Sequence, residues 1–292
     1  MEVTMGLQDK AVITVALSGV AASRAQCPNI PYTPEEYAAE AKRSYDNGCT
    51  MVHIHAREPD GTPTHRVGAY KDIRDAILSQ VPDMIINFST GSVGIPVEER
   101  IQHIVELKPD IGALNMGSMN YAKYSEKRKE FVFDLVFSNP FSDIMKFLTA
   151  MNESGVKPEL ESFDTGHIAN SYPLIDMGIL TKPVHYSLIL GVLGGALPTA
   201  QTLAFMASLL PEGSDWGVIG VSREQWRVVA AAATLGGNVR VGFEDNFYLP
   251  TGEMANSNGD LTKAAADIIR STGRDVASAA EARAIIGLPP RS

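Results

Sequence analysis

The stretch YTPEEYAAEAKRSYDNGCTMVHIHARE, residues 32–58, contains a helix signal followed at once by a strand signal. Thr33 can cap the helix, the proline after it suits the first helical position, Glu36 completes a capping box, and Gly48 marks the end. The short apolar run that follows, residues 49–55, is typical of a buried strand. The stretch therefore predicts a helix that leads into a strand.

The same alternation recurs along the chain. Eight short apolar runs alternate with longer helical patterns, which predicts a parallel sheet covered on its faces. The runs are residues 12–18, 49–55, 84–89, 111–116, 159–163, 183–190, 217–221 and 239–244. Eight such units in 292 residues predict one domain, residues 1–292, folded as a (β/α)8 TIM barrel. A doubly wound sheet is the alternative, but the first turn after a strand lacks GxGxxG.

Two segments fall outside a minimal barrel. Residues 125–140, SEKRKEFVFDLVFSNP, stand between the fourth and fifth units and are expected to form an insertion over the barrel mouth. The tail, residues 276–292, contains SAAEARAIIGLPP, which predicts a short extra helix that could pack on a neighbouring subunit.

Composition excludes several classes of function. The net charge is −9 and no basic run occurs, so neither nucleic acid nor an anionic membrane is an expected partner. Cys27 and Cys49 lack CxxC spacing and cannot form a disulfide framework, which indicates a reducing cytoplasm. Residues 11–23 loosely resemble a signal-peptide core, but their β-branched residues favour a buried strand and they are too short to span a bilayer.

Active sites of such barrels lie at the carboxyl ends of the strands. Side chains of a strand alternate between its faces, so His53 and His55 point the same way, as do Arg240, Gly242 and Glu244. In a closed barrel the second and eighth strands both flank the first, about 10 Å apart. Two imidazoles and a carboxylate that meet there predict a catalytic metal site, zinc or another divalent ion. The alternatives are core packing for the histidines and an ion pair between Arg240 and Glu244.

Polar groups end other predicted strands. Ser89, Thr90 and Gly91 follow the third strand, and hydroxyl and backbone N–H groups before a helix can hold a carboxylate or a phosphate. A plain turn is the alternative, and Asn115 adds polar lining after the fourth strand.

The fifth and sixth units carry two weaker signals. Glu159 and Glu161 share a face of the fifth strand, where a buried carboxylate needs a partner, and Arg240 is the obvious one. The apolar, glycine-rich loop at residues 190–200 suits a flexible pantetheine arm.

The segments TMVHIHAREPDG, NFSTG, LNMGS, KPELESFDTGHI and VRVGFEDN, in this order, resemble the β-keto acid cleavage enzymes, whose best known type acts on 3-keto-5-aminohexanoate. The resemblance runs from the first strand to the last barrel helix. It implies a zinc-dependent barrel enzyme, usually a homotetramer. Such an enzyme converts a β-keto acid and acetyl-CoA to acetoacetate and a new CoA thioester.

The resemblance also implies roles for individual residues. The implied zinc ligands are His53, His55 and Glu244. The implied catalytic groups are Asp245 as the base, Arg240 to orient it, and Glu161, with Glu159 as the alternative, to hold Arg240. Ser89 and the backbone of Thr90 and Gly91 would hold the substrate carboxylate.

One departure from the family affects the substrate. Members that take the aminated substrate carry a glutamate just after the first strand, where this chain has Val20, Ala21 and Ala22. The aminated substrate is therefore not the expected one. Small apolar residues suggest an uncharged tail, whereas the nearby Arg24 leaves room for a second carboxylate, and the sequence does not choose between these options.

Two other functions remain as alternatives. Amidohydrolase-type metal hydrolases of amides or lactones also use HxH in a barrel, and His167 and His185 could then be further ligands. Their HxH usually lies on the first strand, whereas here it lies on the second. A metal or metabolite sensor would normally carry an effector domain, and the sequence suggests none.

Overall fold

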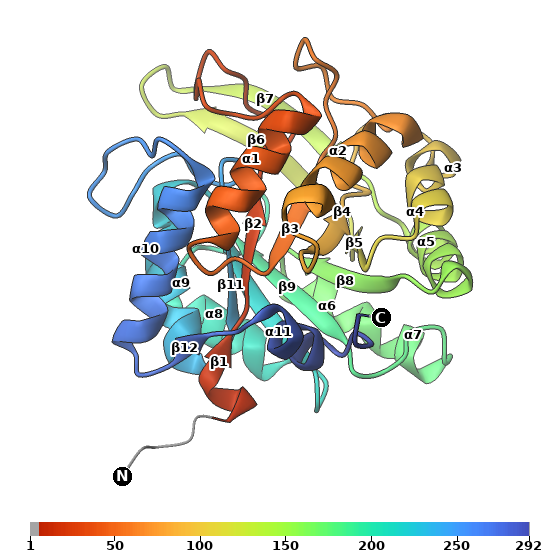
Figure 1. Cartoon of the computed structure of the whole chain (residues 1–292). Helices are drawn as coiled ribbons and strands as arrows, with labels where there is room; N and C mark the ends of the chain where they lie inside the picture. Colours follow the sequence, from red (N-terminus) through yellow and green to blue (C-terminus); the bar gives the residue numbers. More distant parts are fainter. Residues whose placement is uncertain (1–5, 292) are drawn as a thin grey trace.

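The computed structural model describes residues 6–291 and contains a closed barrel of eight parallel strands (Figure 1). The strands follow one another around the ring in the order β10, β11, β2, β3, β4, β5, β8, β9. Their bounds are β2 (Ile13–Ala16), β3 (Met51–Ile54), β4 (Ile85–Phe88), β5 (Ile111–Asn115), β8 (Lys157–Ser162), β9 (His185–Leu190), β10 (Asp215–Gly220) and β11 (Asn238–Val241). Each predicted run contains one of them in whole or in large part, so the predicted TIM barrel is confirmed.

Helices cover the outside of the barrel (Figure 1). They are α1 (Pro34–Tyr45), α2 (Val67–Gln80), α3 (Val97–Arg100), α4 (Gln102–Leu107), α5 (Phe141–Ser154), α6 (Thr165–Ala169), α7 (Ser171–Asp176), α8 (Ala200–Ser208), α9 (Gln225–Leu235) and α10 (Asn258–Ser271). The predicted capping box of α1 is present, since the Thr33 hydroxyl accepts from the Glu36 N–H while the Glu36 carboxylate accepts from the Thr33 N–H.

The order around the ring puts the strands of the predicted metal ligands on either side of β2. β2 pairs with β11 on one side and with β3 on the other, with Thr14 opposite both Arg240 and Met51. Strands β3 and β11 therefore border the same neighbour, and side chains at their carboxyl ends can meet across it.

The insertion is a β-hairpin that begins earlier than expected. β6 (Met119–Ser125) pairs antiparallel with β7 (Glu130–Phe137), and the predicted segment 125–140 begins only at its turn. The hairpin lies over the barrel end opposite α11 (Figure 1). Its Met119 and Phe137 pack on side chains near the ends of β8, β9 and β10. It therefore covers the mouth, as predicted.

The tail closes the other end of the barrel. Its helix α11 (Ala279–Ile286) follows a short parallel pair of β1 (Lys10–Ala11) and β12 (Asp275–Val276). Ala282 and Ile286 are fully buried against side chains at the starts of the strands, namely Val12, Met51, Ile85 and Ile111. The apolar face of this helix is therefore buried against its own barrel, and the contact with a neighbouring subunit stays a prediction.

None of the helices within residues 6–291 is long and apolar enough to cross a membrane.

Candidate active site

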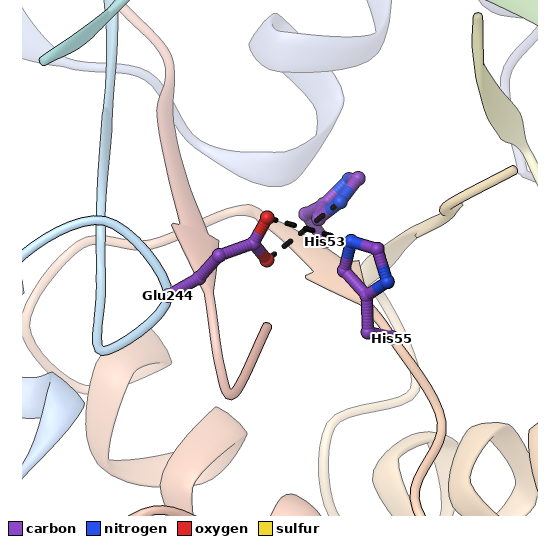
Figure 2. A group of neighbouring side chains, drawn as sticks. All are labelled: His53, His55 and Glu244. Atoms are coloured by element: carbon purple, nitrogen blue, oxygen red, sulfur yellow. Dashed lines mark ion pairs between the residues drawn. The ribbon is translucent and has the colours of Figure 1, made fainter. Parts of the chain in front are cut away.

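His53, His55 and Glu244 meet at the carboxyl end of the barrel (Figure 2). His53 lies on β3 and His55 follows directly after that strand. The Nε2 atom of His53 is 3.8 Å from Oε2 of Glu244, and the Nε2 atom of His55 is 3.4 Å from Oε1. The two imidazoles and the carboxylate therefore point toward one common centre.

This arrangement fits a divalent metal ion such as zinc. Ligands bonded at about 2.0–2.1 Å in a tetrahedral site are about 3.3 Å apart, close to the separations seen here. Oε2 of Glu244 is buried and has no hydrogen-bond partner among the described residues. Burial, together with the charge of Arg240, lowers the pKa of His53 to about 3, which keeps the imidazole neutral and its lone pair free.

Glu244 reaches this centre through a turn and not through strand alternation. β11 ends at Val241, and Glu244 lies in the turn that follows, where the Asp245 N–H donates to the Gly242 carbonyl at 3.0 Å. Gly242 has φ +134°, and a Cβ at this position would stand 2.2 Å from the carbonyl oxygen of Ala16. The predicted meeting of Glu244 with the histidines is confirmed, but the predicted reason for it is wrong.

Arg240 lies at the centre of a buried group of carboxylates. It donates from Nε and Nη2 to the two carboxylate oxygens of Asp245, at 2.9 and 3.0 Å. Nη2 also lies 2.8 Å from Oε1 of Glu244, and Nη1 lies 3.4 Å from Oε1 of Glu161. The partner of Arg240 on β8 is therefore Glu161 and not Glu159.

The three carboxyl groups around Arg240 differ in acidity. Burial raises the pKa of Glu161 to about 8 and that of Asp245 to about 6, and in both cases the charge of Arg240 offsets only part of the effect. For Glu244 burial is outweighed by Arg240 and the two imidazoles, which hold the pKa of this group well below its usual range. Glu244 is thus the group best suited to stay ionised as a ligand.

Glu159 is buried inside the barrel next to the candidate metal centre, and potential ligand atoms of Glu159, Glu161 and His53 lie within 4.8 Å of one another. Glu159 accepts from the Asn87 amide and from the Ser187 hydroxyl. Nε2 of His185 is 3.7 Å away, and Nδ1 of the same ring is 2.6 Å from Oδ2 of Asp215. Burial opposes protonation of His185, but the two carboxylates prevail and raise its pKa to about 9.

The ligand set of a metal hydrolase is not assembled. His185 is engaged with Asp215, and Nδ1 of His167 accepts from the Phe163 N–H at 3.2 Å. Within residues 6–291 neither ring joins a group of side chains that could hold a metal, whereas His53 and His55 do. The structure therefore gives this alternative no support.

Three of the four residues expected to bind the substrate line one cavity, whereas Thr90 does not. Ser89, Gly91 and Asn115 line one cavity, and a Cβ on Gly91 would come within 3.3 Å of the Asn115 amide and 3.5 Å of the Ser89 hydroxyl. Thr90 is turned away, since its hydroxyl donates to the Ala113 carbonyl. The next helix begins only at Val97, so the expected helix N-terminus does not contribute.

The cavity has a volume of about 450 Å³ and opens beside the metal ligands. Its apolar side, hereafter the apolar wall, consists of Tyr121, Phe137, Phe163, Ile189, Val192, Ile219 and Val221. Sequence analysis missed the wall and the nearby His65. The alternating aromatic residues of EFVFDLVF could have indicated the hairpin strand, but no signal singled out His65.

Comparisons with known proteins give matches over nearly the whole chain. A family model described as beta-keto acid cleavage enzyme matches residues 10–288. The chain is 39% identical to a 3-keto-5-aminohexanoate cleavage enzyme of Fusobacterium nucleatum, over 97% of this chain and 99% of that protein. It is 31% identical to a 3,5-dioxohexanoate:acetyl-CoA acetone transferase of Paraburkholderia graminis, over 97% of each chain.

Among solved structures, the chain is similar to ObcA in a binary complex with oxaloacetate, with a TM-score of 0.73 and 19% identity. The match covers 89% of this chain and 68% of that one. At this level of identity the likeness shows a shared barrel fold.

Proposed function

This chain belongs to the beta-keto acid cleavage enzyme family, and on that premise we propose that it converts a β-keto acid and acetyl-CoA to acetoacetate and a new acyl-CoA. The observation that carries the proposal is the meeting of His53, His55 and Glu244 beside the Arg240–Asp245 pair. A carboxylate alone is too weak a base for an unactivated C–H bond, so the reaction needs both features together.

We assign the metal to zinc, held by His53, His55 and Glu244. Zinc would act there as a Lewis acid toward the 3-keto oxygen and stabilise the enolate charge. Ser89, Asn115 and the backbone at Gly91 would hold the substrate carboxylate, because they line the same cavity as His55 and Glu244.

Asp245 takes the proton from C2 of the β-keto acid. C2 then attacks the acetyl carbonyl of acetyl-CoA, so that a C–C bond forms, the C–S bond breaks and CoA thiolate leaves. The thiolate attacks the former 3-keto carbon, the bond between C2 and C3 breaks, and Asp245 returns its proton to C2. Arg240 and Glu161 position Asp245 throughout. No nucleophilic side chain is needed, and neither Cys27 nor Cys49 lines the cavity.

The reaction is tested by incubating the purified protein with acetyl-CoA and a panel of β-keto acids. Acetoacetate and the new acyl-CoA are expected in equal amounts, measured by chromatography and mass spectrometry. If no acid in the panel yields acetoacetate from protein with bound zinc, the proposed reaction is wrong.

The ligand assignment is tested by His53→Ala. This variant should lose both zinc and activity while the barrel still folds, as measured by metal analysis and circular dichroism. His167→Ala is the matched control, since it removes a buried histidine outside the ligand set and should keep its zinc. Full zinc occupancy in His53→Ala would contradict the assignment.

The finer expectations from sequence also stay proposals. We propose a single catalytic domain that assembles as a homotetramer and acts in the cytoplasm, where two buried free cysteines suit a reducing environment. Light scattering of the purified protein measures the assembly, and a monomer at working concentration would contradict it.

A further inference from the structure

The cavity leaves one region for the substrate tail, meaning the carbons beyond the ketone. The cradle around Ser89 and Asn115 takes the carboxylate, and the metal ligands take the ketone. In the ring of eight strands, β10 lies four places from β4 in either direction, so Ile219 and Val221 lie across the barrel from Ser89. The tail therefore points away from the cradle, toward the apolar wall.

The charged groups of the cavity are already engaged with one another. Arg240 is the only lysine or arginine among the described lining residues, and its guanidinium faces Glu161, Glu244 and Asp245. All three carboxyl groups share the arginine, and Glu244 also faces the candidate metal site. No anion is left to pair with an ammonium group on a tail, and no cation is left to pair with a second carboxylate.

Arg24, which the sequence left as a partner for a second carboxylate, does not line this cavity. Its guanidinium donates to the Glu36 carboxylate at 2.5 Å and to the Ile30 carbonyl at 3.0 Å, and lies over the Tyr32 ring at 4.1 Å. Arg24 and Glu36 instead line a separate outer pocket.

His65, the remaining basic side chain of the cavity, does not replace Arg24. Its ring lies 5.8 Å from that of His103, and its buried Nδ1 has no partner among the described residues. Burial lowers the pKa of His65 to about 4, so it is neutral near pH 7 and offers no positive charge.

From this pairing of all charges and the apolar wall, we infer that the enzyme selects β-keto acids whose tail is uncharged and apolar, and that it rejects both cationic and anionic tails. The inference rests on the proposed function and specifies its substrate class. A charged tail would have to leave water without a partner in the cavity, which makes its binding unfavourable.

Val20 offers a place to change this selectivity. The loop of Gly19 to Ala21 packs directly on a metal ligand, since a Cβ on Gly19 would stand 2.5 Å from Cγ of Glu244. Val20 and Ala21 line the cavity, and Val20 is 45% exposed, so a polar side chain there does not disturb the core. An aspartate at Val20 would supply the anion that the cavity lacks.

The test compares kcat/KM for three six-carbon acids with acetyl-CoA: 3-oxohexanoate, 3-keto-5-aminohexanoate and 3-oxoadipate. The wild type should favour the uncharged acid by about tenfold or more over each charged one. Val20→Asp should raise the ratio of aminated to uncharged substrate by about tenfold, while Val20→Asn, of the same shape without the charge, should not.

The outcomes separate the two proposals. If a charged acid is the best substrate of the wild type, the inference about the tail is wrong although the proposed reaction stands. If Val20→Asp and Val20→Asn shift the ratio equally, charge at position 20 of the cavity does not set selectivity and the inference also fails. If none of the three acids yields acetoacetate, in the wild type or in either variant, both the proposed function and the inference are rejected.

Discussion

Arg240 holds Asp245 through two parallel hydrogen bonds, from Nε to Oδ2 at 2.9 Å and from Nη2 to Oδ1 at 3.0 Å. Both side chains are almost fully buried. A two-point contact of this kind fixes the plane of the carboxylate as well as its position, and a lysine could not reproduce it. Asp245 is therefore held in one orientation beside the proposed metal ligands, as the base role that we propose for it requires.

The Asp245→Asn variant tests that role. It keeps the shape of the side chain and leaves all three proposed ligands in place, so zinc should stay bound. Exchange of the C2 protons of a β-keto acid in deuterated water, followed by NMR, should slow by about a hundredfold. Asp134→Asn, on the exposed hairpin, is the matched control and should exchange at the wild-type rate. Wild-type exchange in Asp245→Asn would remove Asp245 from the base position.

The candidate site was predictable where strand periodicity and ring closure determine it. His53 and His55 follow from alternation on a single strand, and the closeness of β3 and β11 follows from a closed ring with β2 between them. The course of the chain through Glu244 was not predictable, because it depends on a positive φ at Gly242 and a turn that breaks the alternation.

The sequence also did not show which groups Arg24 and the C-terminal helix α11 would contact. Arg24 stands three residues after Ala21, which lines the cavity, but its side chain is directed by Glu36 of the next helix and by Tyr32 just before that helix. The apolar face of α11 could be predicted from the sequence, because local periodicity shows that one face of a helix is buried. Periodicity does not show which surface covers that face, and here it is the barrel itself.

Gly19→Ala should weaken the proposed metal site by displacing Glu244. Gly19 has φ +57°, and its added Cβ would stand 2.5 Å from Cγ of Glu244, so Glu244 must move. Zinc affinity, measured by competition with a chelator, should fall by about tenfold or more. Gly94→Ala is matched in backbone strain, at φ +76°, but meets nothing within 4 Å. It should cost only about 1 kcal/mol of stability, and equal zinc loss in both variants would contradict the role given to Gly19.

His185 should make the stability of the barrel fall at alkaline pH. Its pKa is about 9 in the folded state, against 6.5 for the unfolded chain, because Asp215 and Glu159 favour its charged form. A raised pKa means that the folded state binds the proton more tightly, so the stabilisation is complete below pH 6.5 and disappears as pH rises through 9. The free energy of unfolding from urea titrations should fall over this range by about 2–3 kcal/mol.

Two glutamine variants check this pH effect. His185→Gln is the test and His103→Gln is its matched control. His185→Gln should be less stable at neutral pH and should show a clearly smaller decline between pH 6.5 and 9 than the wild type, with the rest of the decline coming from the raised pKa of Glu161. His103→Gln should keep the decline, because burial lowers the pKa of His103 to about 3 and its ring is neutral throughout that range. A full decline in His185→Gln would assign the effect to another group.

Ile286→Ala should destabilise the barrel without changing the chemistry. Ile286 is fully buried against the starts of the strands, at the end of the barrel opposite the cavity. Loss of its side chain leaves a void that the closed ring of strands cannot easily fill, so the free energy of unfolding should fall by about 2–4 kcal/mol. Leu235→Ala, at a position 47% exposed, should cost well under half of that. Below the unfolding transition kcat should match the wild type, because α11 packs on the starts of the strands and the cavity lies at their carboxyl ends. A large fall in kcat with an unchanged free energy of unfolding would contradict this, because it would show that the C-terminal helix affects the cavity and does not stabilise the barrel.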